Sequence, residues 1–77
     1  MVTPVRATTI YVQLFDEGVD VWRPVSAEQV EADIYRLVKA PVPEGEKWEF
    51  APGELVRCRQ QRLSGGDSLV AYAPATL

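Results

Sequence analysis

The chain contains no histidine and only one cysteine, Cys58, and these two scarcities remove most of the side-chain chemistry that enzymes use. Histidine is the commonest general base and the commonest ligand for transition metals, so neither role has its usual candidate. A single cysteine cannot form a disulfide within the chain, whereas small secreted domains usually depend on several. No signal-peptide pattern is present, and no apolar run approaches the roughly 18 residues of a membrane helix. We therefore expect a cytoplasmic protein that makes no membrane contact, is not an enzyme, and holds no cofactor and no metal.

Positive charge is also scarce. Eight lysines and arginines stand against 11 acidic residues, which gives a net charge of -3. A general nucleic-acid binder needs a basic field to replace the counterions of the phosphates, so this balance disfavours nucleic acid as a partner while leaving room for a local basic patch. With 77 residues the chain has room for one domain, spanning 1–77. A domain of this size buries only about 60% of its unfolded surface, so its apolar residues must pack well or be covered by a partner.

What the sequence does contain is a repeated strand pattern. A stretch rich in β-branched and aromatic residues spans 8–15, and its apolar residues alternate with polar ones. A second alternating stretch, 19–25, follows a turn at Gly18, so the two together predict a β-hairpin. Pro24 has no N–H to donate to a neighbouring strand, which predicts that this strand lies at an edge or bends there.

The segment 26–39 is open to two interpretations. Its first four residues have the form of a helix capping box, and its apolar residues recur at helical spacing: Val30, Ile34, Leu37 and Val38. The same residues can instead form two strands, 25–30 and 34–38, joined by a turn. The local pattern taken by itself favours the amphipathic helix.

The second half of the chain is again typical of strands and turns. Residues 40–47 contain two prolines and a glycine and predict a polar surface loop. Pro52 and Gly53 occupy the central positions that a type II turn prefers. Two alternating stretches, 55–63 and 68–73, flank a Gly-Gly hairpin loop. Strands this short, with turns about every 8–12 residues, predict a small barrel or sandwich.

Three segments carry a resemblance to a known family. They are EGVDVWRPV at 17–25, YRL at 35–37 and WEFAPGELVRC at 48–58. The pattern resembles a family of short uncharacterised bacterial proteins over residues 10–72, in which the segment matching 26–38 is strand, turn and strand. The resemblance implies an all-β, SH3-like barrel. We therefore expect a small single-domain SH3-like barrel of five or six short antiparallel strands, in which 26–33 has room for a helical turn. The alternative is an α+β fold with an amphipathic helix at 26–39. The family has no established activity, so no functional residue is carried over.

Several conspicuous side chains have a structural explanation. Cys58 falls on the inward phase of its strand, and without a histidine to activate it we expect a buried, inert thiol. Trp48 and Phe50 lie two residues apart in one short strand and are expected to plug an end of the barrel. Three carboxylates gather around the first turn but lack the spacing of a calcium loop, so we interpret them as solvated: Asp16, Glu17 and Asp20.

The candidate binding surface is built from aromatic and basic side chains on outward phases. Trp22 lies out of phase with the valines of its strand and, with Arg23 and Tyr11, forms a predicted protein-binding surface, because Trp and Arg dominate binding hot spots. The alternative is that Trp22 packs under the 40–47 loop. A second patch is predicted at Arg57 and Arg59.

We therefore expect a non-enzymatic protein-binding or accessory module. Its partner would be another protein or a second copy of the chain, which would cover the unpaired edge near Pro24. The alternative is a nucleic-acid-binding accessory protein that uses a face formed by Arg57, Arg59 and Arg62. These three arginines also have a plain structural explanation, as solvated side chains or cross-strand partners of the acidic residues.

Overall fold

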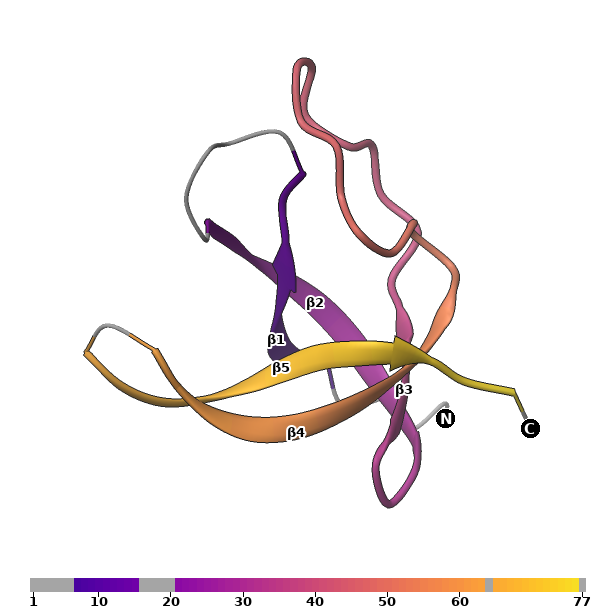
Figure 1. Cartoon of the computed structure of the whole chain (residues 1–77). Coiled ribbons are helices and arrows are strands. Elements are labelled where there is room, and N and C mark those ends of the chain that lie inside the picture. The colour runs from indigo at the N-terminus through magenta and orange to yellow at the C-terminus, as the bar shows by residue number, and fades with distance from the viewer. Residues whose placement is uncertain (1–6, 16–20, 64, 77) are drawn as a thin grey trace.

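The computed structural model describes residues 7–15, 21–63 and 65–76, and within them the chain folds into a closed barrel of five strands (Figure 1). The strands are β1 (Ala7–Gln13), β2 (Trp22–Glu31), β3 (Ile34–Leu37), β4 (Leu55–Leu63) and β5 (Gly66–Pro74). The described residues contain no helix, so the prediction of a small all-β barrel is confirmed and the alternative helix at 26–39 is wrong. The helical turn expected within 26–33 is wrong too, because 26–31 belong to β2 and 32–33 form the turn to β3. The architecture is consistent with an SH3-like barrel. The described residues therefore include no helix long and apolar enough to cross a membrane.

The segment 26–39 forms strands because both of its halves have partners elsewhere in the chain. β2 pairs with β1 along its first half and with β3 along its second, while β3 also pairs with β4. A register shift between Gln29 and Glu31 leaves Val30 as an extra residue, a bulge that breaks strict alternation in β2. Strand pairing on every side outweighs the local pattern, as long-range contacts commonly do.

The barrel closes through a short parallel seam. Each strand is antiparallel to the one before it, so β1 and β5 run in the same direction and pair at Tyr11 and Val70. Beyond that point β1 pairs instead with the loop that precedes β4. The Phe15 N–H donates to the Lys47 carbonyl at 2.7 Å, and the Glu49 N–H donates to the Gln13 carbonyl at 2.9 Å. A junction therefore forms where β1 leaves β5 and joins residues 47–49.

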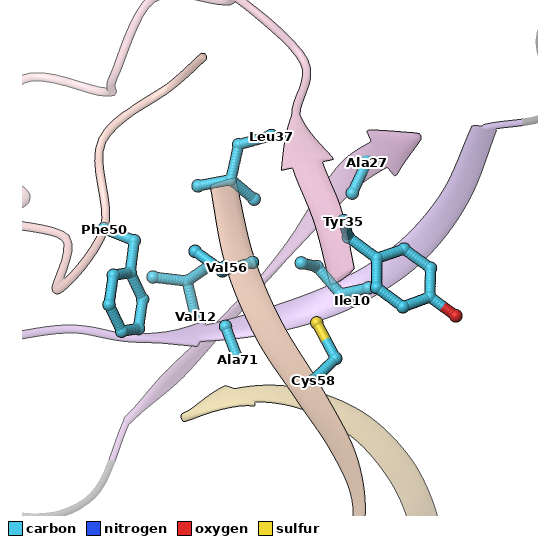
Figure 2. Packing of buried hydrophobic residues seen from close by; sticks show 9 residues of the cluster. All are labelled: Ile10, Val12, Ala27, Tyr35, Leu37, Phe50, Val56, Cys58 and Ala71. Carbon is cyan, nitrogen blue, oxygen red and sulfur yellow. The ribbon is translucent and has the colours of Figure 1, made fainter. Parts of the chain in front are cut away.

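The core fills the barrel with side chains from all five strands and from one loop. Figure 2 shows Phe50 reaching from the loop before β4 toward Val12 and Val56. Trp48 is partly buried against the same cluster and makes a single bridge to Leu14, so the two aromatics do pack at the barrel but do not share a strand. Burying a side chain of this kind stabilises the fold by about 1.5–3 kcal/mol.

The predicted turn after Phe50 is confirmed and holds the loop in place. Gly53 has φ of 86°, as a type II turn requires at that position, and the Glu54 N–H donates to the Ala51 carbonyl at 3.1 Å. The Gly53 N–H also donates to the Leu37 carbonyl at 2.8 Å, which ties the turn to the end of β3. The loop that carries the candidate site is thus fixed at both ends.

Candidate binding site

A hollow opens on the outside of the barrel at the junction of β1, β5 and residues 47–49. We call it the junction hollow; its volume is about 260 Å³ and it is lined by Gln13, Trp22, Glu49, Arg59, Gln61, Ala71 and Tyr72. Gln13 lies two residues beyond Tyr11, and Tyr72 lies two residues beyond Val70, the pair that closes the barrel. The hollow thus occupies the place where the parallel seam comes apart.

Trp22 lines this hollow from the outer face of β2. It pairs directly with Gln13, on the side of the sheet opposite to the buried Val12 and Leu14, and is half-buried. Tyr11 shares that outer side and pairs with Pro24. The out-of-phase position predicted for Trp22 is therefore the observed one.

Tyr72 reaches the hollow because of a bulge in β5. Arg57 pairs with Ala73 and Cys58 pairs with Ala71, which leaves Tyr72 as the extra residue between them. The bulge buries both Val70 and Ala71 and leaves Tyr72 41% exposed. Bulges commonly re-aim a side chain in this way. Strict alternation along β5 gives no reason to select Tyr72. That the adjacent residues Val70 and Ala71 are both buried follows only from the register of β5 with β4.

Arg59 lies over the ring of Tyr72, with its guanidinium carbon 4.6 Å from the ring centroid. This cation–π contact joins β4 to the bulge of β5 at the rim of the junction hollow. Arg59 was predicted in one patch and Trp22 in another, and the structure brings the two into a single site.

Glu49 lines the hollow with a carboxylate that forms no ion pair with any residue of 7–15, 21–63 or 65–76. Burial raises the pKa of its carboxyl group, because the ionised form loses hydration there. Among the described residues, none donates a hydrogen bond to this carboxylate or forms an ion pair with it. Sequence reasoning missed Glu49, since only the pairing of residues 47–49 with β1 carries it to this surface.

Arg23 belongs to a different site. Its Nε donates to Glu46 Oε1 at 3.0 Å, a second guanidinium nitrogen contacts Oε2, and the Trp48 Nε1–H donates to Oε1 at 2.9 Å. The hydrogen bond from Arg23, and to a smaller extent the one from Trp48, lowers the pKa of the Glu46 carboxyl group. The hydrogen bond to Glu46 in turn raises the pKa of Arg23. Arg23 therefore bonds to the 40–47 loop, while its neighbour Trp22 lines the junction hollow. The structure does not bring these two predicted residues into one surface.

The cluster around Glu46 borders a second hollow, of about 290 Å³, which we call the loop hollow. It lies between the start of β2 and the loop after β3, and is lined by Arg23, Pro24, Val25, Ser26, Val38, Ala40, Pro41, Pro43 and Trp48. The Leu14 N–H donates to the Val21 carbonyl, so by antiparallel alternation Pro24 occupies a non-hydrogen-bonded pair and its nitrogen points away from β1. The predicted edge at Pro24 thus faces the loop hollow.

The remaining arginines of the predicted basic face each have an acidic neighbour. Arg57 Nη1 lies 2.9 Å from Asp33 Oδ2, and Arg62 Nε lies 3.8 Å from Asp67 Oδ1. Both pairs are partly or largely exposed and contribute little to stability. They nevertheless reduce the positive charge that a phosphate backbone would meet.

Cys58 is buried, as expected. Burial, with a smaller contribution from the charge of Asp33, raises the pKa of its thiol to about 11, so the nucleophilic thiolate is almost absent at neutral pH. Across residues 7–15, 21–63 and 65–76, no three metal-ligating side chains gather in one place. The acidic trio of the first turn, Asp16, Glu17 and Asp20, lies outside the described residues.

Comparisons of the chain with models of protein families, with curated proteins and with solved structures found no match in any of the three.

Proposed function

We propose that the protein is a non-enzymatic binding module of the cytoplasm, and that the junction hollow is where it holds a protein partner. One observation carries this proposal: Trp22, Arg59 and Tyr72, which come from three different strands, line a single hollow on the outside of the barrel. Tryptophan, tyrosine and arginine are the residue types that dominate binding energy at protein interfaces.

The size of the hollow favours a partner's side chain over a free small molecule. Its volume of about 260 Å³ is below the roughly 300–1,000 Å³ of ordinary ligand pockets. A hollow of this size accommodates one anchoring side chain, while the outer face of the sheet around Tyr11 would supply the surrounding contact area. A second copy of the chain is one partner of this kind.

Nucleic acid is the weaker candidate. Its strongest support is the stacked Arg59–Tyr72 pair beside Trp22, because bases stack on aromatic side chains. Against it stand the net charge of -3 and the acidic partners of Arg57 and Arg62. Binding through phosphates would weaken steeply as salt is added, which makes this alternative easy to recognise.

Selection from a random peptide library tests the proposal. The folded chain is the bait, Tyr72→Ala is the site variant and Arg62→Ala is the control, since Arg62 is exposed and is not among the residues that line the hollow. We expect peptides that bind the chain and the control but not the site variant, and that perturb the indole N–H signal of Trp22. Peptides that bind both variants equally, or tight salt-sensitive binding of single-stranded oligonucleotides that Tyr72→Ala abolishes, would count against a protein partner at this site.

A further inference from the structure

We propose that the junction hollow receives a cationic side chain, a lysine or an arginine, from the protein partner. The inference rests on the proposed function and names the chemistry of the anchoring residue. The cation would lie between the aromatic side chains of Trp22 and Tyr72 and the carboxylate of Glu49.

The first argument is the unsatisfied carboxylate. Glu49 lines the hollow without a hydrogen bond or ion pair from any described side chain, although its neighbour in the loop, Glu46, has two donors. An ionised carboxylate that has lost hydration gains more from a nearby cation than a fully solvated one does, because the local dielectric is lower. A cation entering the hollow would supply the missing partner.

The second argument is the aromatic wall. The faces of tryptophan and tyrosine rings attract cations such as the lysine ammonium and the arginine guanidinium groups, and the attraction is stronger where the cation is partly desolvated. The structure already contains one example of the contact, because the guanidinium of Arg59 lies over the ring of Tyr72. That ring therefore accepts a cation in the folded protein.

Arg59 gives the inference its sharpest consequence. In the free protein Arg59 occupies one face of Tyr72 and places a positive charge at the rim of the hollow. An incoming cation must compete with it, so removing Arg59 should strengthen the binding of a cation. If the occupant were an anion or a phosphate backbone, Arg59 would be its main attraction and removing it would weaken binding. The sign of one substitution thus separates the two chemistries.

The test uses four small probes on the whole folded chain, followed by the Trp22 indole signal in two-dimensional NMR. The probes are the N-acetyl methylamides of lysine, arginine, norleucine and glutamate, used up to tens of millimolar. The variants are Glu49→Gln with Glu44→Gln as its exposed control in the same loop, and Arg59→Ala with Arg62→Ala as its control on the same strand.

We expect the lysine and arginine probes to bind more tightly than norleucine, their neutral analogue, by about two- to fivefold or more. Glu49→Gln should weaken the two cationic probes and leave norleucine unchanged, and Arg59→Ala should tighten them by about two- to fivefold. The two control variants should behave as the parent chain does.

The inference is overturned if norleucine binds as tightly as lysine, if Arg59→Ala weakens the lysine probe, or if no cationic probe shifts the Trp22 signal. Preferential binding of the glutamate probe, lost in Tyr72→Ala, would reject a cationic anchor and still leave the junction hollow as a binding site. The proposed function fails separately, through a peptide selection that yields no Tyr72-dependent binder.

Discussion

Two glutamates of one loop, Glu46 and Glu49, lie on either side of Trp48 and have opposite electrostatic surroundings. Glu46 accepts hydrogen bonds from Arg23 and Trp48, and these bonds lower its pKa. Glu49 has no such donor among the described residues, and burial raises its pKa. Glu46 is thus a hydrogen-bonded structural residue, whereas the carboxylate of Glu49 is available to accept a hydrogen bond or an ion pair from a ligand.

The difference arises from strand geometry. Trp48 pairs with the buried Leu14, so the loop is extended there and successive side chains point to opposite sides. Trp48 turns inward toward Arg23 and Glu46, and Glu49 turns outward to the junction hollow. A short extended segment can therefore complete the core with one residue and supply a surface site with the next.

The largest effect should come from Phe50, because it anchors the loop that carries both glutamates. Phe50→Ala removes a side chain that is only 6% exposed and should cost about 3–5 kcal/mol of unfolding free energy. Urea denaturation followed by tryptophan fluorescence measures this loss. Phe15→Ala is the control, since Phe15 is 49% exposed and its loss should change stability by less than about 0.5 kcal/mol. Equal losses for the two variants would mean that Phe50 does not hold the loop.

Cys58 tests the claim that burial shifts the pKa of a group, here with a smaller contribution from the charge of Asp33. A thiol with a pKa of about 11 should react with a disulfide reagent at pH 8 roughly a hundredfold more slowly than the unfolded chain does. The rates of colour release with and without denaturant give this ratio. Similar rates in the two conditions would show that the thiol is accessible and ionised.

The two glutamates themselves should respond differently to the same substitution. Glu46→Gln removes a charged acceptor from two donors and should lower the urea midpoint at neutral pH. Glu49→Gln removes a charge that burial disfavours and should leave the midpoint unchanged or raise it slightly. If both variants lose stability alike, Glu49 has a structural partner in the folded protein.

The smallest effect is the pH dependence of those differences. Glu46 has a lowered pKa, so its contribution is complete above its ordinary value of 4.5 and is lost as the pH falls through the folded value. Glu49 has a raised pKa, so the folded state is favoured below 4.5 and this advantage is lost as the pH rises through the folded value. Urea midpoints should be measured from neutral pH to below 4.5. As the pH falls, the midpoint of Glu46→Gln should approach that of the parent chain from below, and the midpoint of Glu49→Gln should approach it from above. Differences that stay constant with pH would contradict these assignments.

The sequence predicted much of the fold because its strands alternate clearly. The alternation of β1, the turn at Pro52 and Gly53, and the inward phase of Cys58 all follow from local rules and appear in the structure. The segment around Val30 did not follow from such rules, because its local pattern favoured a helix and its strands form by pairing with distant segments.

The candidate site was predicted only in part, since it depends on contacts between distant segments. Trp22 and Arg59 were selected from their outward phase, but their meeting required the closure of β1 on β5. Tyr72 and Glu49 were missed because a bulge and a loop pairing place them. The register of the strands and the pairing of the loop depend on contacts throughout the barrel, so they cannot be predicted from any short stretch of sequence.

The most direct test is a carbon-detected NMR titration of the two carboxyl groups, with and without the N-acetyl-lysine methylamide probe. We expect Glu49 to titrate above 4.5 and Glu46 below it, and the probe to lower the pKa of Glu49 while leaving Glu46 unchanged. Equal pKa values for the two groups, or a Glu49 that does not respond to saturating probe, would contradict the account of one hydrogen-bonded carboxylate and one that is available to a ligand.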